Sequence, residues 1–515
     1  MTEFIEADVA IVGAGLGGLS AARHLQEAGY SVVVLEHHSK PGGYAHFFRK
    51  EDFRFEVALH ALDGLGQGGW ARPMFETLGI LDDVEFNRLE PFYTVRFPDF
   101  EVAVPADIPG YLGEFARVFP EELAGAKELF AAIERVGHDM ARYASDRAAG
   151  LRVEQSEMPG TYPDMAMAFA VPWSVFIGQY LRSDEAKAFV STLWGYLGLP
   201  PSQVSAGQFA LTILSYHTAG AWYPTGGSGT MTWAIAHAIE AHGGQVHLRH
   251  RVTGITPAAE GFEITTNKDL AVRSRAVVSN ASPSATLGLL PAGANGQWAA
   301  DVEADRPALS SLVVHLGLNK DVAAEGWTYH EFFDMVGYDL EAEYRAILEG
   351  RFADVGMIVS NYTIIDPTCA PDGGSVLALT TLAPWDHRNV WGTGGDLADY
   401  RVNPEYMQVK EEAGNILIDR AERLIPGLRA SIVTSHVGTP LTNVRYVRQP
   451  HGSIYGREQT VMNQMNRRRP TTPIEGLFLA GAWIGGGGMT AAVGSGKTAA
   501  RAAARYLAEP AEDMD

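Results

Sequence analysis

A glycine-rich turn near the N-terminus constrains this chain more than any other feature. An apolar run that ends at Val12 leads into Gly13-Ala14-Gly15-Leu16-Gly17-Gly18, which matches the pattern GxGxxG and opens a helical segment. Gly13 permits a tight turn, Gly15 lets backbone N–H groups approach a pyrophosphate, and Gly18 lets the helix pack on the sheet. The pattern therefore predicts a strand, turn and helix that hold a dinucleotide.

An acidic residue after the second strand supports this interpretation. The apolar run Ser31–Leu35 ends at Glu36, eighteen residues after Gly18. A carboxylate at this position can accept hydrogen bonds from both ribose hydroxyls. An acid in place of an arginine favours a free 2′-hydroxyl, as in FAD or NAD, and disfavours NADP.

Composition limits the classes of protein that need to be considered. With 515 residues, the chain is long enough for two domains. Its net charge of −21 repels phosphate backbones, so we expect no nucleic-acid partner. Its single cysteine, Cys369, excludes an internal disulfide and a multi-cysteine metal site, and we expect no metal. Acidic residues near the N-terminus, where a secretory signal carries basic ones, predict a cytoplasmic location.

The middle of the chain is unusually apolar. Residues 188–239 contain no Asp, Glu, Lys or Arg, and residues 165–181 just before them are rich in Met and aromatic side chains. Pro172 and Pro200-Pro201 interrupt these segments, so we expect no membrane-spanning helix. They are instead predicted to form a buried helical core, the lining of an apolar ligand cavity or a surface that contacts a membrane.

The second half of the chain predicts a second sheet that is partly antiparallel. Its final strand and Ala-rich helix are expected to pack tightly on a sheet. Expected strands are 245–255, 262–266, 276–280, 310–318, 355–362, 375–382 and 477–483, and expected helices are 233–241, 405–424 and 491–507.

Two further glycine motifs lie far from the first turn in the sequence. Pro41-Gly42-Gly43 follows Glu36, and Leu477–Gly481 opens into the C-terminal helix. This arrangement resembles the two-dinucleotide-binding flavoproteins, which include amine oxidases and phytoene desaturases. In that group the last strand usually ends in Gly-Asp, whereas this chain has Gly481-Ala482. The resemblance implies FAD as cofactor and an α/β fold, in which a Rossmann-like FAD-binding domain is interleaved with an α+β substrate domain.

Finer motifs narrow the resemblance. The motifs resemble the retinol saturase, carotenoid isomerase and phytoene desaturase family, which implies chemistry at carbon–carbon double bonds. The family implies an FAD-binding domain from residues 1–90, 221–290 and 431–515 and a substrate domain from residues 91–220 and 291–430. The motifs are Gly42-Gly43-Tyr44-Ala45-His46-Phe47, Phe53-Arg54-Phe55-Glu56 with Leu59-His60, Tyr223-Pro224-Thr225-Gly226-Gly227, Thr439-Pro440-Leu441-Thr442-Asn443 and Gly452-Ser453-Ile454-Tyr455-Gly456.

The candidate site residues follow from these motifs. His60 and His46 are candidate proton donors or acceptors because histidine titrates near neutral pH, and Tyr455 is a third candidate. For each of them, a structural side chain that is packed or hydrogen-bonded is the alternative. By analogy with the family, the residues expected to hold FAD are Gly13, Gly15, Gly17, Gly18, Glu36, Gly42, Gly43, Val252, Gly481, Ala482, Met489 and Thr490.

Three further motifs carry weaker predictions. Gly64–Gly69 also matches GxGxxG but lacks a following ribose-binding acid, so we interpret it as a loop near the flavin. Gly496-Lys497-Thr498 lies inside a predicted helix and is not expected to bind ATP. Arg467-Arg468-Arg469 is predicted to be a solvated basic face, with a lipid-headgroup anchor as the alternative.

The sequence thus predicts an FAD-dependent oxidoreductase or isomerase that acts on C=C bonds of a carotenoid, retinoid or other isoprenoid lipid. We expect an apolar small-molecule substrate and peripheral contact with a membrane from which that substrate is taken. The electron donor or acceptor is not apparent from the sequence. The alternatives are an amine-oxidase-like flavin oxidase with a soluble amine substrate and a non-catalytic prenyl-lipid carrier of the same fold.

Overall fold

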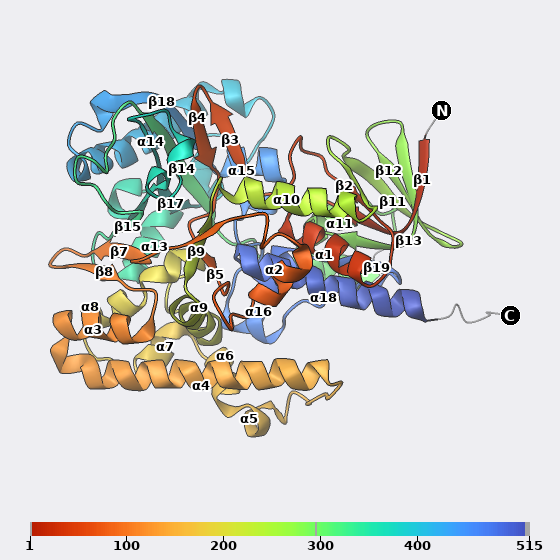
Figure 1. Ribbon diagram of the computed structural model, residues 1–515, viewed down its shortest axis with the longest axis horizontal. Coiled ribbons are helices and arrows are strands. Elements are labelled where there is room, and N and C mark those ends of the chain that lie inside the picture. The colour runs from red at the N-terminus through yellow and green to blue at the C-terminus, as the bar shows by residue number, and fades with distance from the viewer. Residues whose placement is uncertain (1–2, 294–295, 510–515) are drawn as a thin grey trace.

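The computed structural model describes residues 3–293 and 296–509, which form two large sheets and a layer of helices (Figure 1). The first sheet has seven strands. In spatial order they are β10 (Gln245–His247), β2 (Val32–Leu35), β1 (Glu3–Val12), β13 (Leu270–Ser279), β12 (Gly261–Thr266) and β11 (Val252–Ala258), with β19 (Leu477–Leu479) paired to β13.

The centre of this sheet is parallel and covered on both faces. Strands β1, β2, β10, β13 and β19 run parallel, whereas β11 and β12 form an antiparallel extension. All four residues of β2 are buried, as expected for a parallel strand between two helical layers. One face carries α1 (Leu16–Glu27), α10 (Ser228–Ala241) and α18 (Met489–Ala508), and the other carries α11 (Pro283–Leu287) and α12 (Gly296–Glu303).

The second sheet also has seven strands and is mostly antiparallel. It is packed against α14 (Pro404–Leu424) through a separate hydrophobic core. In spatial order its strands are β18 (Ile432–Gly438), β14 (Ser310–Leu318), β17 (Ser375–Ala383), β16 (Met357–Asn361), β15 (Glu331–Asp334), β7 (Tyr93–Arg96) and β8 (Glu101–Val104).

Both sheets draw on segments from distant parts of the chain, in keeping with the predicted interleaved α/β architecture. The domain boundaries themselves remain a prediction. Within the segment 431–515 that we assign to the FAD-binding domain, strand β18 pairs with β14 of the second sheet. This strand therefore belongs structurally with the substrate-side sheet.

A layer of helices lies below the two sheets in the view of Figure 1. The apolar middle segment forms much of it, and Trp173 stacks on Phe209 with ring centroids 4.5 Å apart. No helix within the described ranges is both long and apolar enough to cross a bilayer. The layer consists of α3 (Ile108–Val118), α4 (Leu123–Ala148), α5 (Met158–Thr161), α6 (Pro163–Ala170), α7 (Trp173–Ile177), α8 (Asp184–Val190) and α9 (Ala206–Ala219).

Smaller elements connect these layers. β3 (Phe47–Lys50) pairs with β4 (Phe53–Glu56), and β9 (Ala221–Pro224) lies between β5 (Leu62–Asp63) and β6 (Phe86–Arg88). The remaining helices are α2 (Arg72–Leu78), α13 (Leu340–Leu348), α15 (Pro440–Val447), α16 (Val461–Met465) and α17 (Ala482–Gly485).

Most predicted elements are present, but one predicted strand is divided in two and another ends four residues early. Residues 245–255 do not form one strand, because β10 pairs with β2 whereas β11 pairs with β12, and Arg249 between them has a φ of 61°. The strand predicted at 477–483 ends at Leu479 and is followed by α17. The alternating pattern continues through the first break and the apolar run continues through the second, so hydrophobic pattern alone did not locate them.

The C-terminal helix packs not only on the sheet but also directly on α1. A Cβ built at Gly496 of α18 would lie 2.2 Å from the carbonyl oxygen of Gly17 and 2.7 Å from the Cβ of Ser20. The Ser20 hydroxyl donates to the carbonyl of Val493 at 2.8 Å. The two helix backbones therefore approach so closely that only glycine fits at position 496.

This contact predicts the effect of a single methyl group. We expect Gly496→Ala to force the two helices apart and to lower the free energy of unfolding by about 1–3 kcal/mol. The matched control is Gly494→Ala on the same helix, where the added Cβ would meet side-chain atoms only at 3.6 Å and beyond. Urea denaturation should show the loss for Gly496→Ala and none for Gly494→Ala, and equal stabilities would contradict the close approach.

Candidate functional site

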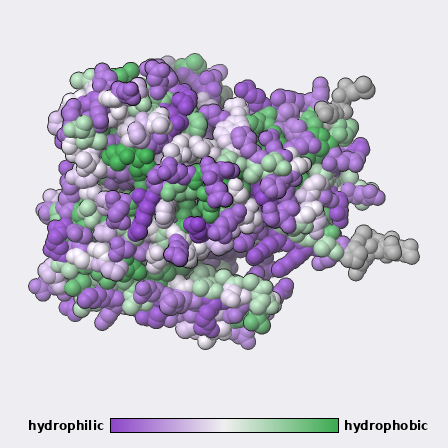
Figure 2. All heavy atoms as spheres, viewed as in Figure 1, coloured by the Kyte–Doolittle hydropathy of each residue, from purple (hydrophilic) through white to green (hydrophobic). Residues whose placement is uncertain are grey.

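One large cavity of about 2720 Å³ extends from the ends of β1 and β2 to the second sheet and the helical layer. Its lining includes Gly13 and Glu36 at one end and Phe333 of β15 at another. The same cavity opens between the helical layer and the body above it, where Figure 2 shows the surface to be hollowed. The end of the cavity that is predicted to hold a dinucleotide is thus continuous with an apolar chamber.

Glu36 stands at the end of β2 and binds the glycine turn. Its Oε2 accepts a hydrogen bond from the backbone N–H of Ala14 at 2.7 Å, and its Oε1 accepts one from the N–H of His38 at 2.7 Å. Burial raises the pKa of Glu36, although these two hydrogen bonds act to lower it. Each carboxylate oxygen retains acceptor capacity, so the group fits the two hydroxyls of a ribose.

The start of α1 provides a cradle without side chains. Gly13 has a φ of 93°, in the region that favours glycine, and turns the chain from β1 into the helix. Gly15 caps the helix with no side-chain hydrogen bond, and the first turn of the helix contains no acidic residue. Gly43 lies against it, because a Cβ added at Gly43 would be 3.5 Å from the Cα of Gly15. Backbone N–H groups at this helix start fit a pyrophosphate.

Asn280 closes the same part of the cavity from the end of β13. A Cβ at Gly15 would lie 2.5 Å from its Nδ2, and a Cβ at Gly17 would lie 2.5 Å from its Oδ1. That Oδ1 is buried and has no hydrogen-bond partner within the described ranges. Asn280 was not identified in the sequence, where it appeared only as the last residue of a predicted strand.

The third group of predicted cofactor residues lies where α17 and α18 begin. Gly481, Ala482, Met489 and Thr490 all line the cavity, and the Thr490 hydroxyl donates to Asp63. In total, eleven of the twelve predicted cofactor residues line it, and their contacts with a cofactor remain a prediction. The exception is Gly18, whose Cβ would lie 2.1 Å from the carbonyl oxygen of Gly13, in keeping with the predicted packing role.

His46 and Tyr455 line the cavity but are held by backbone groups. His46 Nδ1 lies 2.7 Å from the Gly43 carbonyl oxygen, and burial lowers the pKa of His46 to about 4. The Tyr455 hydroxyl donates to the carbonyl of Gly195 at 2.7 Å, and burial raises its pKa. A histidine with this pKa is neutral at pH 7, so the geometry favours a structural role for His46.

His60 differs from both because it faces a buried carboxylate. Its Nδ1 lies 2.9 Å from Oε1 of Glu331 on β15 and 3.1 Å from the hydroxyl of Ser360 on β16. Burial alone would lower the pKa of His60, but the charge and hydrogen bond of Glu331 outweigh it and the pKa is raised. The pKa of Glu331 is correspondingly lowered, although burial acts to raise it. The two side chains form a buried ion pair.

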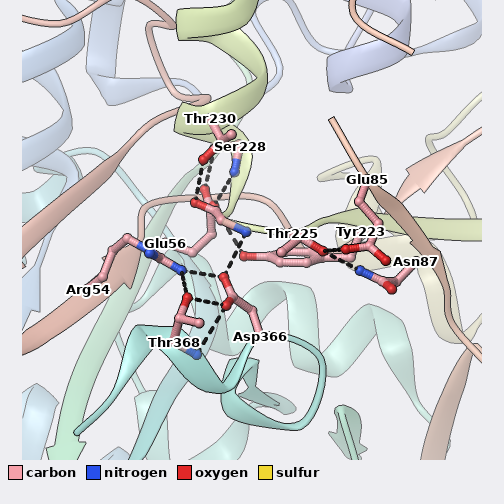
Figure 3. A network of polar contacts seen from close by, with 11 residues as sticks. Arg54, Glu56, Glu85, Asn87, Tyr223, Thr225, Ser228, Thr230, Asp366 and Thr368 are labelled. Atoms are coloured by element: carbon pink, nitrogen blue, oxygen red, sulfur yellow. Dashed lines mark hydrogen bonds and ion pairs between the residues drawn. The ribbon is translucent and has the colours of Figure 1, made fainter. Parts of the chain in front are cut away.

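A network around Glu56 fixes the turn that carries His60 (Figure 3). The Glu56 carboxylate accepts hydrogen bonds from the Ser228 backbone N–H at 2.8 Å and hydroxyl at 2.6 Å. It also accepts from the N–H groups of residues 57–59, which lead to His60. Nearby, Asp366 binds Arg54 and accepts the N–H of Gly226 at 2.8 Å. The motifs Phe53–Glu56 and Tyr223–Gly227 are therefore joined at one point.

Aromatic and aliphatic side chains line the chamber around His60. Tyr196 stacks on the His60 ring with centroids 5.8 Å apart. The apolar segment 188–239 supplies much of this lining, so its predicted roles as buried core and as cavity wall both apply. Other lining side chains are Trp194, Tyr216, Val313, Phe333, Met335, Ile347, Met357, Ile358, Tyr362, Leu382 and Tyr455.

The three weaker motifs have different outcomes. Gly64–Gly69 forms a turn whose last residues line the cavity, and Gly496-Lys497-Thr498 lies inside α18, as predicted. The solvated face predicted for Arg467-Arg468-Arg469 is correct only for the first and last of these residues, which are exposed. Arg468 is only 15% exposed and pairs with Asp305 at 2.6 Å, and all three arginines line the cavity.

Comparisons with known proteins agree with this geometry. The family model described as flavin containing amine oxidoreductase matches residues 16–504. The chain is 24% identical over 503 residues to all-trans-retinol 13,14-reductase of Danio rerio, covering 92% of this chain and 82% of the relative. It is 25% identical over 519 residues to prolycopene isomerase 2 of an Oncidium hybrid cultivar, covering 92% and 80%. Cyclohexylamine oxidase from Brevibacterium oxydans has the same fold, with a TM-score of 0.61, 18% identity and coverage of 98% and 100%.

The dinucleotide end of the cavity yields a binding prediction. We expect Glu36→Gln to weaken FAD binding about 10- to 100-fold, because hydrogen bonds to a charged acceptor contribute about 1.5–3 kcal/mol. The matched control is Glu6→Gln, which replaces a carboxylate on β1 outside the cavity. Titration of the apoproteins with FAD, followed by flavin fluorescence, measures both affinities. Equal FAD affinity of Glu36→Gln and the unmodified chain would contradict the assignment.

Proposed function

Because this chain belongs to the family of flavin-containing amine oxidoreductases, its cofactor is FAD, and we propose that it acts on C=C bonds of a polyene or isoprenoid lipid. FAD would be held by the glycine turn, Glu36 and the starts of α17 and α18. Retinol reduction and prolycopene isomerisation, named for two relatives, are both reactions of conjugated double bonds. Desaturation, saturation and cis–trans isomerisation fit the same architecture.

The continuity of the cavity carries this proposal. The space that contains Glu36 also contains the aromatic chamber with His60, so one ligand site leads into the other without an intervening wall. A long apolar chain gains contact area from such aromatic and aliphatic walls, at about 25 cal/mol for each Å² removed from water. An elongated hydrocarbon is therefore the class of ligand that this chamber fits.

The side chains of the protein are proposed to supply a proton to the reaction. When bound, FAD supplies hydride transfer, and the protein supplies orientation and electrostatics. Saturating a C=C bond adds a hydride to one carbon and a proton to its neighbour, and desaturation reverses both. His60 is the residue we propose for the proton, because Glu331 keeps it charged in an otherwise apolar chamber.

The charge of the chamber supports a neutral reacting group over a soluble amine. Glu331 is already neutralised by His60, and Asp63 is bound by hydroxyl groups of Thr490 and Ser215. Burial raises the pKa of Glu343 to about 7, so this carboxyl is partly neutral. Glu331, the carboxylate that contacts His60, is therefore not available to pair with an ammonium ion. The carrier alternative has no use for the Glu36 and glycine contacts.

Contact with a membrane remains part of the proposal. A polyene that left a bilayer through water would lose hydrophobic stabilisation, so direct transfer favours a protein that docks at the surface. Exposed apolar side chains lie close in sequence to residues that line the cavity: Leu151 is 58% exposed, Met462 64% and Met465 46%. These residues are candidates for the docking contact.

An anaerobic reaction tests the function. The purified protein is reduced photochemically and mixed with all-trans-retinol, with prolycopene or with a matched saturated alcohol. We expect a polyene either to reoxidise the flavin with loss of a double bond or to change its geometry while the flavin stays reduced. Products are identified by chromatography. No change in either polyene, combined with oxidation of an amine such as cyclohexylamine in air, would contradict the proposal.

The ion pair predicts a change in pH dependence. In the reducing direction His60 must be protonated, and its raised pKa extends activity to higher pH. Glu331→Gln removes the opposing charge and leaves burial, so we expect the alkaline limb of the kcat/KM profile to move down by about 1–3 pH units. Ser360→Ala removes only the longer hydrogen bond and should shift the limb less. An unmoved limb in Glu331→Gln would exclude His60 as the proton donor.

A further inference from the structure

The outer part of the cavity is basic, although the chain as a whole is acidic. The protein has 40 Lys and Arg against 61 Asp and Glu, yet the cavity lining contains ten Lys and Arg and five Asp and Glu side chains. Such a local reversal of charge attracts anions into the cavity. The arginines of this outer part are Arg147, Arg152, Arg467, Arg468, Arg469, Arg501 and Arg505.

Arg467 is held in place by three different helices. Its Nε donates to Oε1 of Gln464 on α16 at 2.7 Å, and its Nη2 donates to Oε1 of Gln208 on α9 at 2.8 Å. Its guanidinium carbon lies 5.6 Å from the ring centroid of Phe169 on α6. These contacts fix the planar donor group and leave other N–H groups unused, which is the arrangement that suits bidentate recognition of an anion.

Arg467 has no counter-ion in the parts of the chain that the structure describes. No Asp or Glu oxygen from residues 3–293 or 296–509 lies within 4.0 Å of it, and both of its hydrogen-bond acceptors are neutral amides. Its side chain is exposed where it lines the cavity, yet the surrounding protein lowers its pKa. The adjacent Arg468, in contrast, is paired with Asp305 at 2.6 Å. An arginine that is fixed in place, has no counter-ion and faces a cavity with a mostly basic lining is available to bind an anionic ligand.

A second arginine lies in the same region, on a helix that packs against α6 and α9. Arg147 near the end of α4 donates to the Tyr143 hydroxyl at 3.4 Å, and its guanidinium carbon lies 5.8 Å from the Tyr143 ring centroid. Tyr143 also interacts electrostatically with Arg467. Arg469 lines the cavity two residues further along the chain, again with no carboxylate partner in the described ranges. The positive charge therefore comes from α4 and from the segment that follows α16.

We propose that Arg467, with Arg147 and Arg469, binds the anionic end group of an elongated substrate whose apolar body occupies the aromatic chamber. The end group is a carboxylate or a phosphate, because both match the planar fork of arginine. The inference rests on the proposed function and narrows its substrate class from neutral polyenes to amphiphilic ones. The double bond reacts near His60, while the charged end remains at the outer arginines.

Binding of a matched pair of probes tests this assignment without turnover. All-trans-retinoic acid and all-trans-retinol share one polyene chain and differ in the charge of the end group. We titrate each into the oxidised holoenzyme and follow quenching of tryptophan fluorescence. The acid should bind about tenfold more tightly, because hydrogen bonds from arginine to a carboxylate are stronger than those to a neutral hydroxyl.

Variants then assign the preference to its residues. Arg467→Gln and Arg469→Gln should each weaken binding of the acid several-fold and leave the alcohol unchanged, whereas Arg467→Lys retains part of the preference. The control is Arg423→Gln, an arginine of α14 that does not line the cavity. Melting temperatures verify that each variant is folded.

The outcomes separate this inference from the proposed function. Equal affinity for acid and alcohol, or equal weakening of both by Arg467→Gln, overturns the end-group site while leaving polyene binding intact. Binding of neither probe contradicts both proposals. The arginines could instead bind the phosphate of a lipid headgroup. Flotation with vesicles of phosphatidylcholine, with and without phosphatidylglycerol, tests this alternative. If Arg467→Gln abolishes binding to the anionic vesicles and does not affect the acid, the arginines bind lipid headgroups and the substrate assignment is wrong.

Discussion

The close approach of backbones at the start of α1 is the constraint on which the rest of the site depends. Gly15 meets Asn280 and Gly43, Gly17 meets Gly481, and Gly496 meets Gly17, so three distant segments converge where a side chain would not fit. Glu36 joins this point by accepting hydrogen bonds from two backbone N–H groups. These close contacts shape the end of the cavity near Glu36. They also fix α18, whose first residues form part of the cavity wall.

The cavity combines two chemical environments that require different supports. Backbone N–H groups and one carboxylate form its dinucleotide end, where polar groups remain available to a ligand. The chamber around His60 is lined mainly by apolar side chains, so the ion pair of His60 and Glu331 must be held by neighbours on β15 and β16 and by the turn that Glu56 fixes. A buried charge pair is tolerated when its geometry is fixed in this way. The second sheet thus supplies groups that complete the chamber around His60.

The sequence placed the predicted cofactor residues near one another, as the cavity lining does, but it did not give the partners of His60 in the chamber. The glycines, Glu36 and the C-terminal helix start are local patterns with fixed spacing, so their joint placement could be predicted. Glu331 could not be assigned to His60, because it lies 271 residues further along and its partner depends on how β15 pairs. Likewise, Arg467 looked like part of an ordinary surface run, whereas its contacts with α6 and α9 place it at the cavity wall. Such long-range pairings carry no local signal in a single sequence.

The absorbance spectrum of the oxidised protein tests whether FAD and an apolar chain occupy one continuous cavity. The purified protein is titrated with a polyene that absorbs outside the flavin bands, and the spectrum is compared with that of free FAD. We expect a yellow protein whose flavin bands shift saturably as the polyene binds. A colourless protein that does not take up FAD, or flavin bands that stay constant while the polyene binds, would contradict it.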